Sequence, residues 1–195
     1  MIIILHSNYD KGGSILNSNT RNLAVTAVLA AVICVLGPLS IPIGPVPISL
    51  GLFGVFLAIY ILGMKRGTLA VIIYILIGLV GVPVFAGFTG GPQKLFGPTG
   101  GYIIGYILTA LISGYIVEHF SSNIVLQFVG MVLGLVVLYA IGTLWLAYQA
   151  HMDLPKALAA GVIPFIPLDL VKIVLATLVG RAVRVRLVHS GLIHA

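Results

Sequence analysis

The chain has 195 residues, of which 60% are hydrophobic and only 7% are Asp, Glu, Lys or Arg. This composition excludes a water-soluble globular domain, because so few charged side chains cannot cover its surface. The single cysteine, Cys34, excludes an internal disulfide framework and a cysteine-based metal site. The net charge is +6, but the basic residues lie between apolar segments, so no nucleic-acid partner is expected.

Long segments without charged residues predict membrane-spanning helices. We expect six of them, near residues 22–37, 49–64, 67–83, 100–117, 123–148 and 157–183. Six spans place both termini on one side, which would carry seven basic residues: Lys11, Arg21, Lys65, Arg66, Arg181, Arg184 and Arg186. The opposite side would carry only Lys94 and Lys156. By the positive-inside rule, both termini are cytoplasmic. The expected fold class is therefore an all-α integral membrane protein.

The chain is expected to divide into three parts. Residues 1–20 are polar after a short apolar start that cannot span a membrane, and they lack a signal-peptide cleavage pattern. We interpret them as a disordered cytoplasmic leader. Residues 21–188 form the six-helix transmembrane domain, and residues 189–195 form a C-terminal tail.

Prolines and glycines gather on the outer side of this topology. The first outer loop, Gly37–Pro47, has no charge, and the second, Gly81–Tyr102, is rich in glycine and contains Phe85, Phe88 and Phe96. Irregular backbone near a membrane is tolerated only where it is buried in protein or lines a watery cavity. The two loops are therefore expected to cap a ligand pocket. The alternative is a flexible connector, which would seldom expose its phenylalanines to water.

Asp169 and Lys172 are the only ionisable pair inside a predicted span. An ionised side chain at the middle of a bilayer costs at least about 2.5–3.5 kcal/mol, so both groups must face protein or water. Their i,i+3 spacing puts them on one helical face, where they could neutralise each other. Pro164 and Pro167 interrupt the helix just before the pair, which favours a site for a small ligand with N–H donors and a carboxylate.

The sequence contains no Gly-Lys-Ser/Thr phosphate-binding loop, so ATP-driven transport would need hydrolysis on another chain. No Ser/His/Asp or Glu/His constellation can be assembled in the spans, and the histidines lack metal-ligand spacing. We therefore predict that the chain is not an enzyme and has no catalytic residues, metal site or cofactor. A channel is disfavoured because there is no ring of charges or repeated filter.

Four motifs resemble the BioY family, the biotin-binding S-components of energy-coupling factor (ECF) vitamin transporters. They are IPIGPVPISL at 41–50, GVPVFAG at 81–87, GPTGGY at 97–102 and the Asp169-x-x-Lys172 pair. The resemblance extends from about Arg21 to Arg186. It implies a six-helix protein of a prokaryotic-type plasma membrane, with a pocket near the outer face under the 1–2 and 3–4 loops.

The resemblance further implies that Asp169 and Lys172 contact biotin and that segments 44–49 and 87–102 enclose it. Within the second segment, the implied substrate contacts are Thr89, Gly91, Lys94 and Tyr102. Asp169 would accept hydrogen bonds from the ureido N–H groups. The partner of the carboxylate would be either Lys94 or Lys172.

The family docks on a transmembrane coupling protein through a small-residue face of helix 1. Ala27 and Ala31 match the Ala-x-x-x-Ala spacing, although packing within the chain would explain them equally well. The expected function is a subunit that binds biotin at the outer face and delivers it to the cytoplasm, surrounded by lipid and driven by partner ATP-binding cassette ATPases. The alternatives are an S-component for thiamine or riboflavin and a membrane-integral enzyme acting on a lipid.

Overall fold

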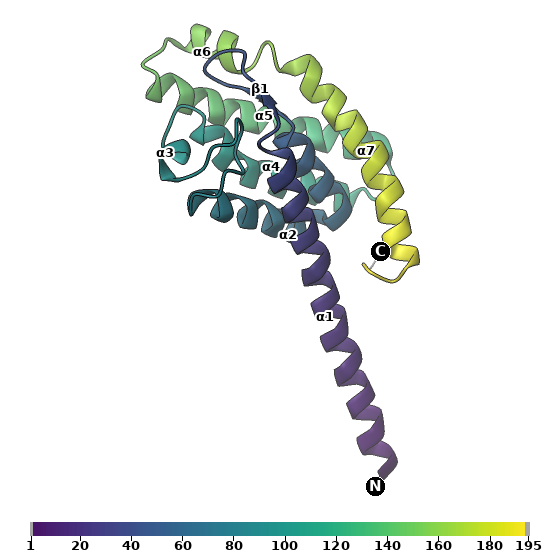
Figure 1. Cartoon of the computed structure of the whole chain (residues 1–195). Helices are drawn as coiled ribbons and strands as arrows, with labels where there is room; N and C mark the ends of the chain where they lie inside the picture. The colour runs from purple at the N-terminus through teal and green to yellow at the C-terminus, as the bar shows by residue number, and fades with distance from the viewer. Residues whose placement is uncertain (1, 194–195) are drawn as a thin grey trace.

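The computed structural model describes residues 2–193, with side chains described from residue 19 onward. Within this range the fold is helical apart from one short two-stranded ladder (Figure 1). The elements in chain order are α1 (Ile2–Leu36), β1 (Ser40–Ile41), β2 (Ile48–Ser49), α2 (Gly51–Leu79), α3 (Pro92–Leu95), α4 (Gly100–His119), α5 (Ile124–Gln149), α6 (Leu154–Gly161) and α7 (Ile166–His189).

Among the described residues, four helices are long and apolar enough to cross a membrane. They are α1 from Asn19 onward, α2, α4 and α5. Helices α6 and α7, which meet at a bend of 46°, form a fifth candidate span if they are taken together. The chain is therefore an all-helical, multi-pass membrane protein with four or five candidate spans.

Helix α2 contains both the 49–64 and the 67–83 spans expected from the sequence, and it is broken inside. Gly63 has φ 76° and ψ −167°, which is not helical. A Cβ atom on Gly67 would lie 3.0 Å from the Cα of Ile59, whereas eight residues of straight helix are about 12 Å long. The two segments of α2 therefore fold back on each other at Gly63.

A carboxylate stabilises this turn. The backbone N–H of Met64 donates to Glu118 Oε1 at 2.9 Å, which satisfies an amide that the break removes from the helical ladder. A Cβ atom on Gly63 would collide with the same carboxylate. Gly63 is therefore required both by its backbone conformation and by the close approach of Glu118.

Small residues bring α4 and α5 close together. Ser113 Oγ donates to the carbonyl of Gly130 at 3.2 Å, and Thr109 Oγ1 donates to the carbonyl of Gly134 at 3.1 Å. Such contacts are typical of helix pairs in membranes, where close backbone approach replaces the hydrophobic driving force. The pair forms a wall of the core, in which the largest fully buried side chains include Phe56, Ile59, Met131, Leu146 and Ile173.

The two outer loops are held to each other by backbone hydrogen bonds. The first loop contains the antiparallel ladder of β1 and β2, in which Ser40 pairs with Ser49. The second loop meets the first where the N–H of Gly87 donates to the carbonyl of Pro38 at 3.1 Å. Mutual hydrogen bonding is what irregular backbone needs near a membrane.

The phenylalanines of the second loop divide into two groups. Phe85 is completely buried and packs edge-on against Tyr74, with ring centroids 5.5 Å apart. Phe88 and Phe96 are 67% and 65% exposed, so the expectation that this loop would not expose its phenylalanines is wrong for both. Phe88 lies in a tight turn with φ 55°, which is closed by paired hydrogen bonds between Phe85 and Thr89. A turn this tight has no interior against which the side chain of Phe88 could pack.

The single helix expected over residues 157–183 is wrong, because the structure has two helices there. Pro164 lies in the break between α6 and α7, and Pro167 lies in the first turn of α7. Proline lacks an N–H and disfavours helical backbone in the residue before it. The hydroxyl of Tyr102 donates to the carbonyl of Gly161 at 3.1 Å, so the last residue of α6 has a side-chain partner.

The ends of the chain are formed by α1 and by a short turn after α7. Helix α1 begins at Ile2 and its first part extends away from the bundle (Figure 1), so the helix includes residues 2–20 of the expected leader. No Pro occurs in this stretch to end a helix. After α7, the N–H of Leu192 donates back to the carbonyl of Leu187 at 2.8 Å. Residues 1, 194 and 195 lie outside the described residues.

Candidate functional site

Asp169 and Lys172 lie in the first two turns of α7 and form a buried ion pair. Their side chains are joined by a contact of 2.8 Å between Lys172 Nζ and Asp169 Oδ1. Only 3% of Asp169 and 8% of Lys172 is exposed. Burial of this kind is strongly unfavourable for a single charge and tolerable for a paired one, so removal of either partner alone would leave an uncompensated charge.

Two further hydrogen bonds tie the pair to other parts of the fold. The hydroxyl of Tyr139, on α5, donates to Asp169 Oδ2 at 2.7 Å. Lys172 Nζ donates to the backbone carbonyl of Ser49, the last residue of β2, at 2.8 Å. The pair therefore links α5, α7 and β2 at one point.

The pair lines a small cavity of about 50 Å³ under the outer loops. The cavity is lined by Val46, Pro47, Ser49, Leu52, Tyr102, Tyr106, Leu138, Tyr139, Gly161, Phe165, Asp169 and Lys172. Pockets that bury a small organic molecule usually have about 300–1,000 Å³. A ligand of that size could enter only if the cap or the side chains beneath it moved.

Tyrosines give the cavity aromatic walls with polar tips. Tyr102 and Tyr106 are one turn apart on α4 and share a face, while Tyr139 comes from α5. The flat rings offer apolar contact area, and the hydroxyls offer hydrogen bonds. Sequence reasoning missed Tyr106 and Tyr139. Two signals could have found them: the i,i+4 spacing from Tyr102, and the position of Tyr139 in the middle of an apolar span, away from the membrane interfaces where tyrosines gather.

Three other predicted contact residues lie outside this cavity. Thr89 Oγ1 donates to the carbonyl of Ala86 at 3.0 Å. Gly91 precedes α3, and its N–H donates to the carbonyl of Gly78 at 2.7 Å. Lys94 is half-buried in α3, and this burial lowers the pKa of its ammonium group. Of the predicted set, the structure brings together Asp169, Lys172 and Tyr102.

Helix α5 also holds the second outer loop. Trp145 Nε1 donates to the carbonyl of Gly97 at 2.9 Å, and Gln149 Nε2 donates to the carbonyl of Phe96. Both carbonyls belong to the segment between α3 and α4. The lone tryptophan is therefore in direct contact with the cap.

The predicted docking face on α1 is open. Ala24, Ala27 and Ala31 are exposed, while Ala30 and Ile33 on another face of the helix are buried. The alanines thus take no part in packing within the chain.

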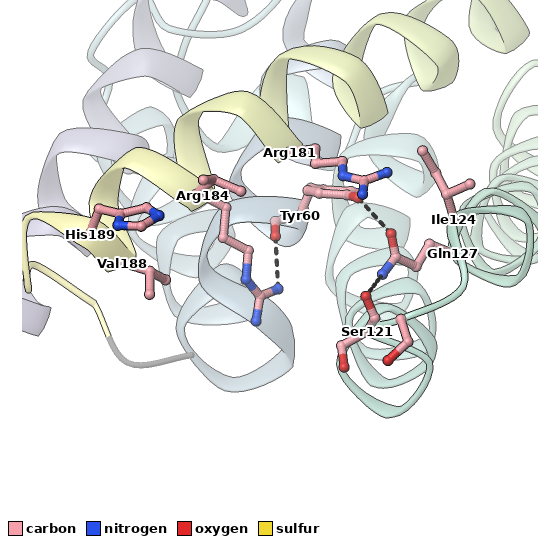
Figure 2. Close-up of a pocket in the computed structure, with 10 residues that line it drawn as sticks. Tyr60, Ser121, Ile124, Gln127, Arg181, Arg184, Val188 and His189 are labelled. Atoms are coloured by element: carbon pink, nitrogen blue, oxygen red, sulfur yellow. Dashed lines mark hydrogen bonds between the residues drawn. The ribbon is translucent and has the colours of Figure 1, made fainter.

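A much larger cavity, of about 400 Å³, lies at the other end of the bundle and has a different character. It is lined by Tyr60, Gln127, Arg181 and Arg184 among others (Figure 2). Among the described residues it is lined by no carboxylate, so it lacks an anionic acceptor like the one that Asp169 gives to the smaller cavity. In the part of the chain that the structure describes, no group of His, Cys, Asp and Glu is arranged to hold a metal ion.

Comparison with known proteins gives one consistent result. A family model described as the BioY family matches residues 10–189. The chain is 45% identical over 159 residues to the biotin transporter BioY of Thermotoga maritima, covering 82% of this chain and 93% of that protein. It is 34% identical over 175 residues to the biotin transporter BioY2 of Lactococcus lactis, covering 90% and 96%.

A solved structure is similar over nearly the whole fold. It is a crystal structure of the S-component for biotin from an ECF-type ABC transporter. The TM-score is 0.81 and the sequence identity is 32%, covering 86% of this chain and 93% of that chain.

Proposed function

This chain belongs to the BioY family, and we propose that it is the membrane subunit of an ECF-type transporter that binds biotin. The observation that carries the proposal is the similarity of almost the entire fold to an S-component for biotin. It is supported by relatives named as biotin transporters, including two from Thermotoga maritima and Lactococcus lactis that match over more than nine-tenths of their own length. No observation favours thiamine, riboflavin or a lipid-modifying enzyme. Because these relatives are transporters, we expect the chain to have no enzymatic activity of its own.

Biotin fits the chemistry of the cavity beneath the outer loops. Its ureido ring has two N–H donors and a carbonyl, and its valerate chain ends in a carboxylate. Asp169 would accept from the ureido N–H groups while Lys172 keeps it ionised. The rings of Tyr102, Tyr106 and Tyr139 would pack against the bicyclic ring.

Lys172 is the better candidate partner for the valerate carboxylate. An ammonium group has three N–H donors, and Lys172 uses two of them on Asp169 and Ser49. Lys94 is outside the cavity lining and, like Thr89 and Gly91, would reach biotin only after the second loop moved. We therefore propose these three residues as contacts of a closed, ligand-bound cap.

We propose that the chain crosses the membrane six times. Counting the two segments of α2 separately, and α6 with α7 as one span, gives this number. An even number of crossings leaves both termini on one side of the membrane, and the concentration of arginine near the end of α7 supports the cytoplasmic side. The loops that contain β1, β2 and α3 then face outward in the plasma membrane and form the cap.

Transport needs partners, because the chain has no phosphate-binding loop. We propose that the exposed face of Ala24, Ala27 and Ala31 docks on a transmembrane coupling protein that also binds ATP-binding cassette ATPases. Small side chains allow two helix backbones to approach closely. The openness of this face supports docking over the alternative of packing within the chain.

Calorimetry on the detergent-purified chain tests the proposed substrate. We expect saturable one-to-one binding of biotin and none of thiamine or riboflavin at the same concentration. Biotin methyl ester should bind at least about tenfold more weakly, since it cannot form the ion pair with Lys172. Binding of another vitamin, with none of biotin, would refute the assignment.

A further inference from the structure

The large cavity at the C-terminal end of α7 is formed by three parts of the chain. Helix α7 contributes Arg181, Arg184, Val185, Val188 and His189, and α2 contributes Tyr60 (Figure 2). The start of α5 and the turn before it contribute Ser121, Ser122, Ile124 and Gln127. Its volume of about 400 Å³ is in the range of small-molecule sites. At 1.5 Å per residue along α7, Arg181 in this cavity lies about 18 Å from Asp169. The two cavities are therefore far apart.

Among the described side chains, no carboxylate forms an ion pair with either arginine of this cavity. Both ion pairs found among the described side chains involve other residues. Arg184 uses one N–H, from Nη1, to reach the backbone carbonyl of Tyr60 at 3.2 Å. A guanidinium group has five N–H donors, so most of those on Arg184 and Arg181 remain for a ligand.

A neighbouring cavity of about 420 Å³ shares Ser121 and Arg184 and extends the basic surface with Lys65 and Arg66. Glu118 also lines it, but its carboxylate accepts from the backbone of Met64 and caps the turn in α2. The local charge is therefore strongly positive even when Glu118 is included.

The polar floor of the cavity is buried and hydrogen-bonded within itself. Tyr60 and Gln127 are only 3% and 5% exposed, and the hydroxyl of Tyr60 donates to Gln127 Oε1 at 2.5 Å (Figure 2). Gln127 Nε2 in turn donates to the carbonyls of Phe120 and Ser121, at 3.1 and 2.9 Å. This network fixes the turn between α4 and α5 opposite the arginines, which pre-organises a binding site.

Aliphatic side chains from Ile124, Val185 and Val188 complete the lining. Helix α7 has 24 residues, so it is about 36 Å long and exceeds a hydrocarbon core of about 30 Å. Its last turns, which carry the arginines, therefore reach the headgroup layer. A ligand here would meet two cations together with apolar side chains.

We propose that this cavity binds a phosphate-bearing anion, through Arg181 and Arg184, at the cytoplasmic surface of the membrane. Guanidinium groups bind phosphate oxygens in a bidentate manner, and Ser121 and Ser122 in the lining of the same cavity offer hydroxyl donors. The phosphate can come from the headgroup of an anionic phospholipid or from free phosphate. The proposal does not depend on biotin as the substrate.

Native mass spectrometry of the detergent-purified chain tests the proposal with three probes: phosphatidylglycerol, phosphatidylcholine and inorganic phosphate. A lipid site should give a saturable one-to-one complex with phosphatidylglycerol and a much weaker one with phosphatidylcholine. Arg184→Gln and, separately, Arg181→Gln should each weaken binding at least about tenfold, because each removes a charge-assisted contact. Arg184→Lys should restore only part of the affinity.

Arg186→Gln is the matched control, because it removes the same charge from the same helix outside the cavity lining. It should change affinity less than about twofold. The thermal unfolding midpoint, measured on each variant, checks folding. If inorganic phosphate binds with the same dependence on Arg181 and Arg184, the proposal holds with free phosphate as the source. Equal losses in all three Gln variants, or no saturable binding of any phosphate probe, would overturn it.

Discussion

Asp169 and Lys172, in the outer cavity, do more than neutralise each other. Lys172 donates to the carbonyl of Ser49 as well as to Asp169, so it also attaches the first outer loop to α7. A ligand carboxylate that drew Lys172 away from Ser49 would release this attachment. Binding and loop movement are then linked through a single ammonium group.

The first prediction separates a ligand site from a structural ion pair. Asp169→Asn or Lys172→Met alone should destabilise the protein by about 3–5 kcal/mol, because each leaves one buried charge without its partner. The double variant, which leaves none, should recover much of this loss and fold. It should nevertheless bind biotin a hundredfold or more weakly, since two charged hydrogen bonds of about 1.5–3 kcal/mol each are removed. Thermal unfolding and calorimetry measure both effects, and near-native affinity in the folded double variant would refute the site.

The second prediction concerns the hydroxyl of Tyr139. Tyr139→Phe removes one hydrogen bond to a carboxylate and keeps the ring, so it should cost about 1.5–3 kcal/mol in stability, biotin affinity or both. Tyr148→Phe is the control, because Tyr148 lies on the same helix and is 78% exposed. It should change the melting temperature and the biotin affinity very little. Identical behaviour of the two variants would show that Tyr139 does not support Asp169.

At the scale of elements, the sequence predicted α4, α5 and the end of α1 within a few residues, because long uncharged stretches between polar turns identify them. It also placed a turn between two segments near Lys65 and Arg66, which agrees with the fold-back at Gly63. It did not predict where α6 ends and α7 begins, since Pro164 and Pro167 permit either a kinked helix or two helices. The hydrogen bond between Tyr102 and Gly161, which satisfies the break, depends on packing.

The candidate site was also predictable only in part, because its contacts depend on packing between distant parts of the chain. Asp169 and Lys172 stand out because charge is rare inside a span. Their contacts with Tyr139 and Ser49 join positions 30 and 123 residues apart in the chain. No local pattern encodes such distances. Thr89 and Lys94 were implied by resemblance, and the structure places them beside the cavity rather than in its lining.

The third prediction tests the turn in α2. Gly63→Ala should lower the free energy of unfolding by about 1–3 kcal/mol from backbone strain. A further loss of about 1 kcal/mol should follow as Glu118 is pushed away from Met64. Gly191→Ala is a matched control, because Gly191 also has positive φ, +67°, but nothing lies within 4 Å of its Cβ position. Equal losses measured by denaturant titration would mean that the contact with Glu118 contributes nothing.

At the scale of the whole molecule, the fourth prediction concerns assembly. Replacing both Ala27 and Ala31 with Leu should abolish co-purification with the coupling protein while leaving biotin affinity unchanged, because the added side chains lie on an exposed face. The control is Ala182→Leu, which enlarges an exposed alanine on α7 and should leave assembly intact. Loss of biotin binding in the double variant would instead indicate that the α1 face packs within the chain.

The path of the whole chain through the membrane gives the last prediction. If α2 crosses twice, the connection that contains α3 is outside, and the α4–α5 turn and the C-terminus are inside. If α2 crosses only once, all three positions change sides. The two topologies can be distinguished with single cysteines, in a chain whose own cysteine is removed by Cys34→Ala. The cysteines are introduced one at a time at the exposed positions Gln93, Ser122 and Ser190. A membrane-impermeant maleimide applied to intact cells should label only Gln93→Cys. Ser122→Cys and Ser190→Cys should react only after permeabilisation, and the reverse pattern would exclude six crossings with both termini in the cytoplasm.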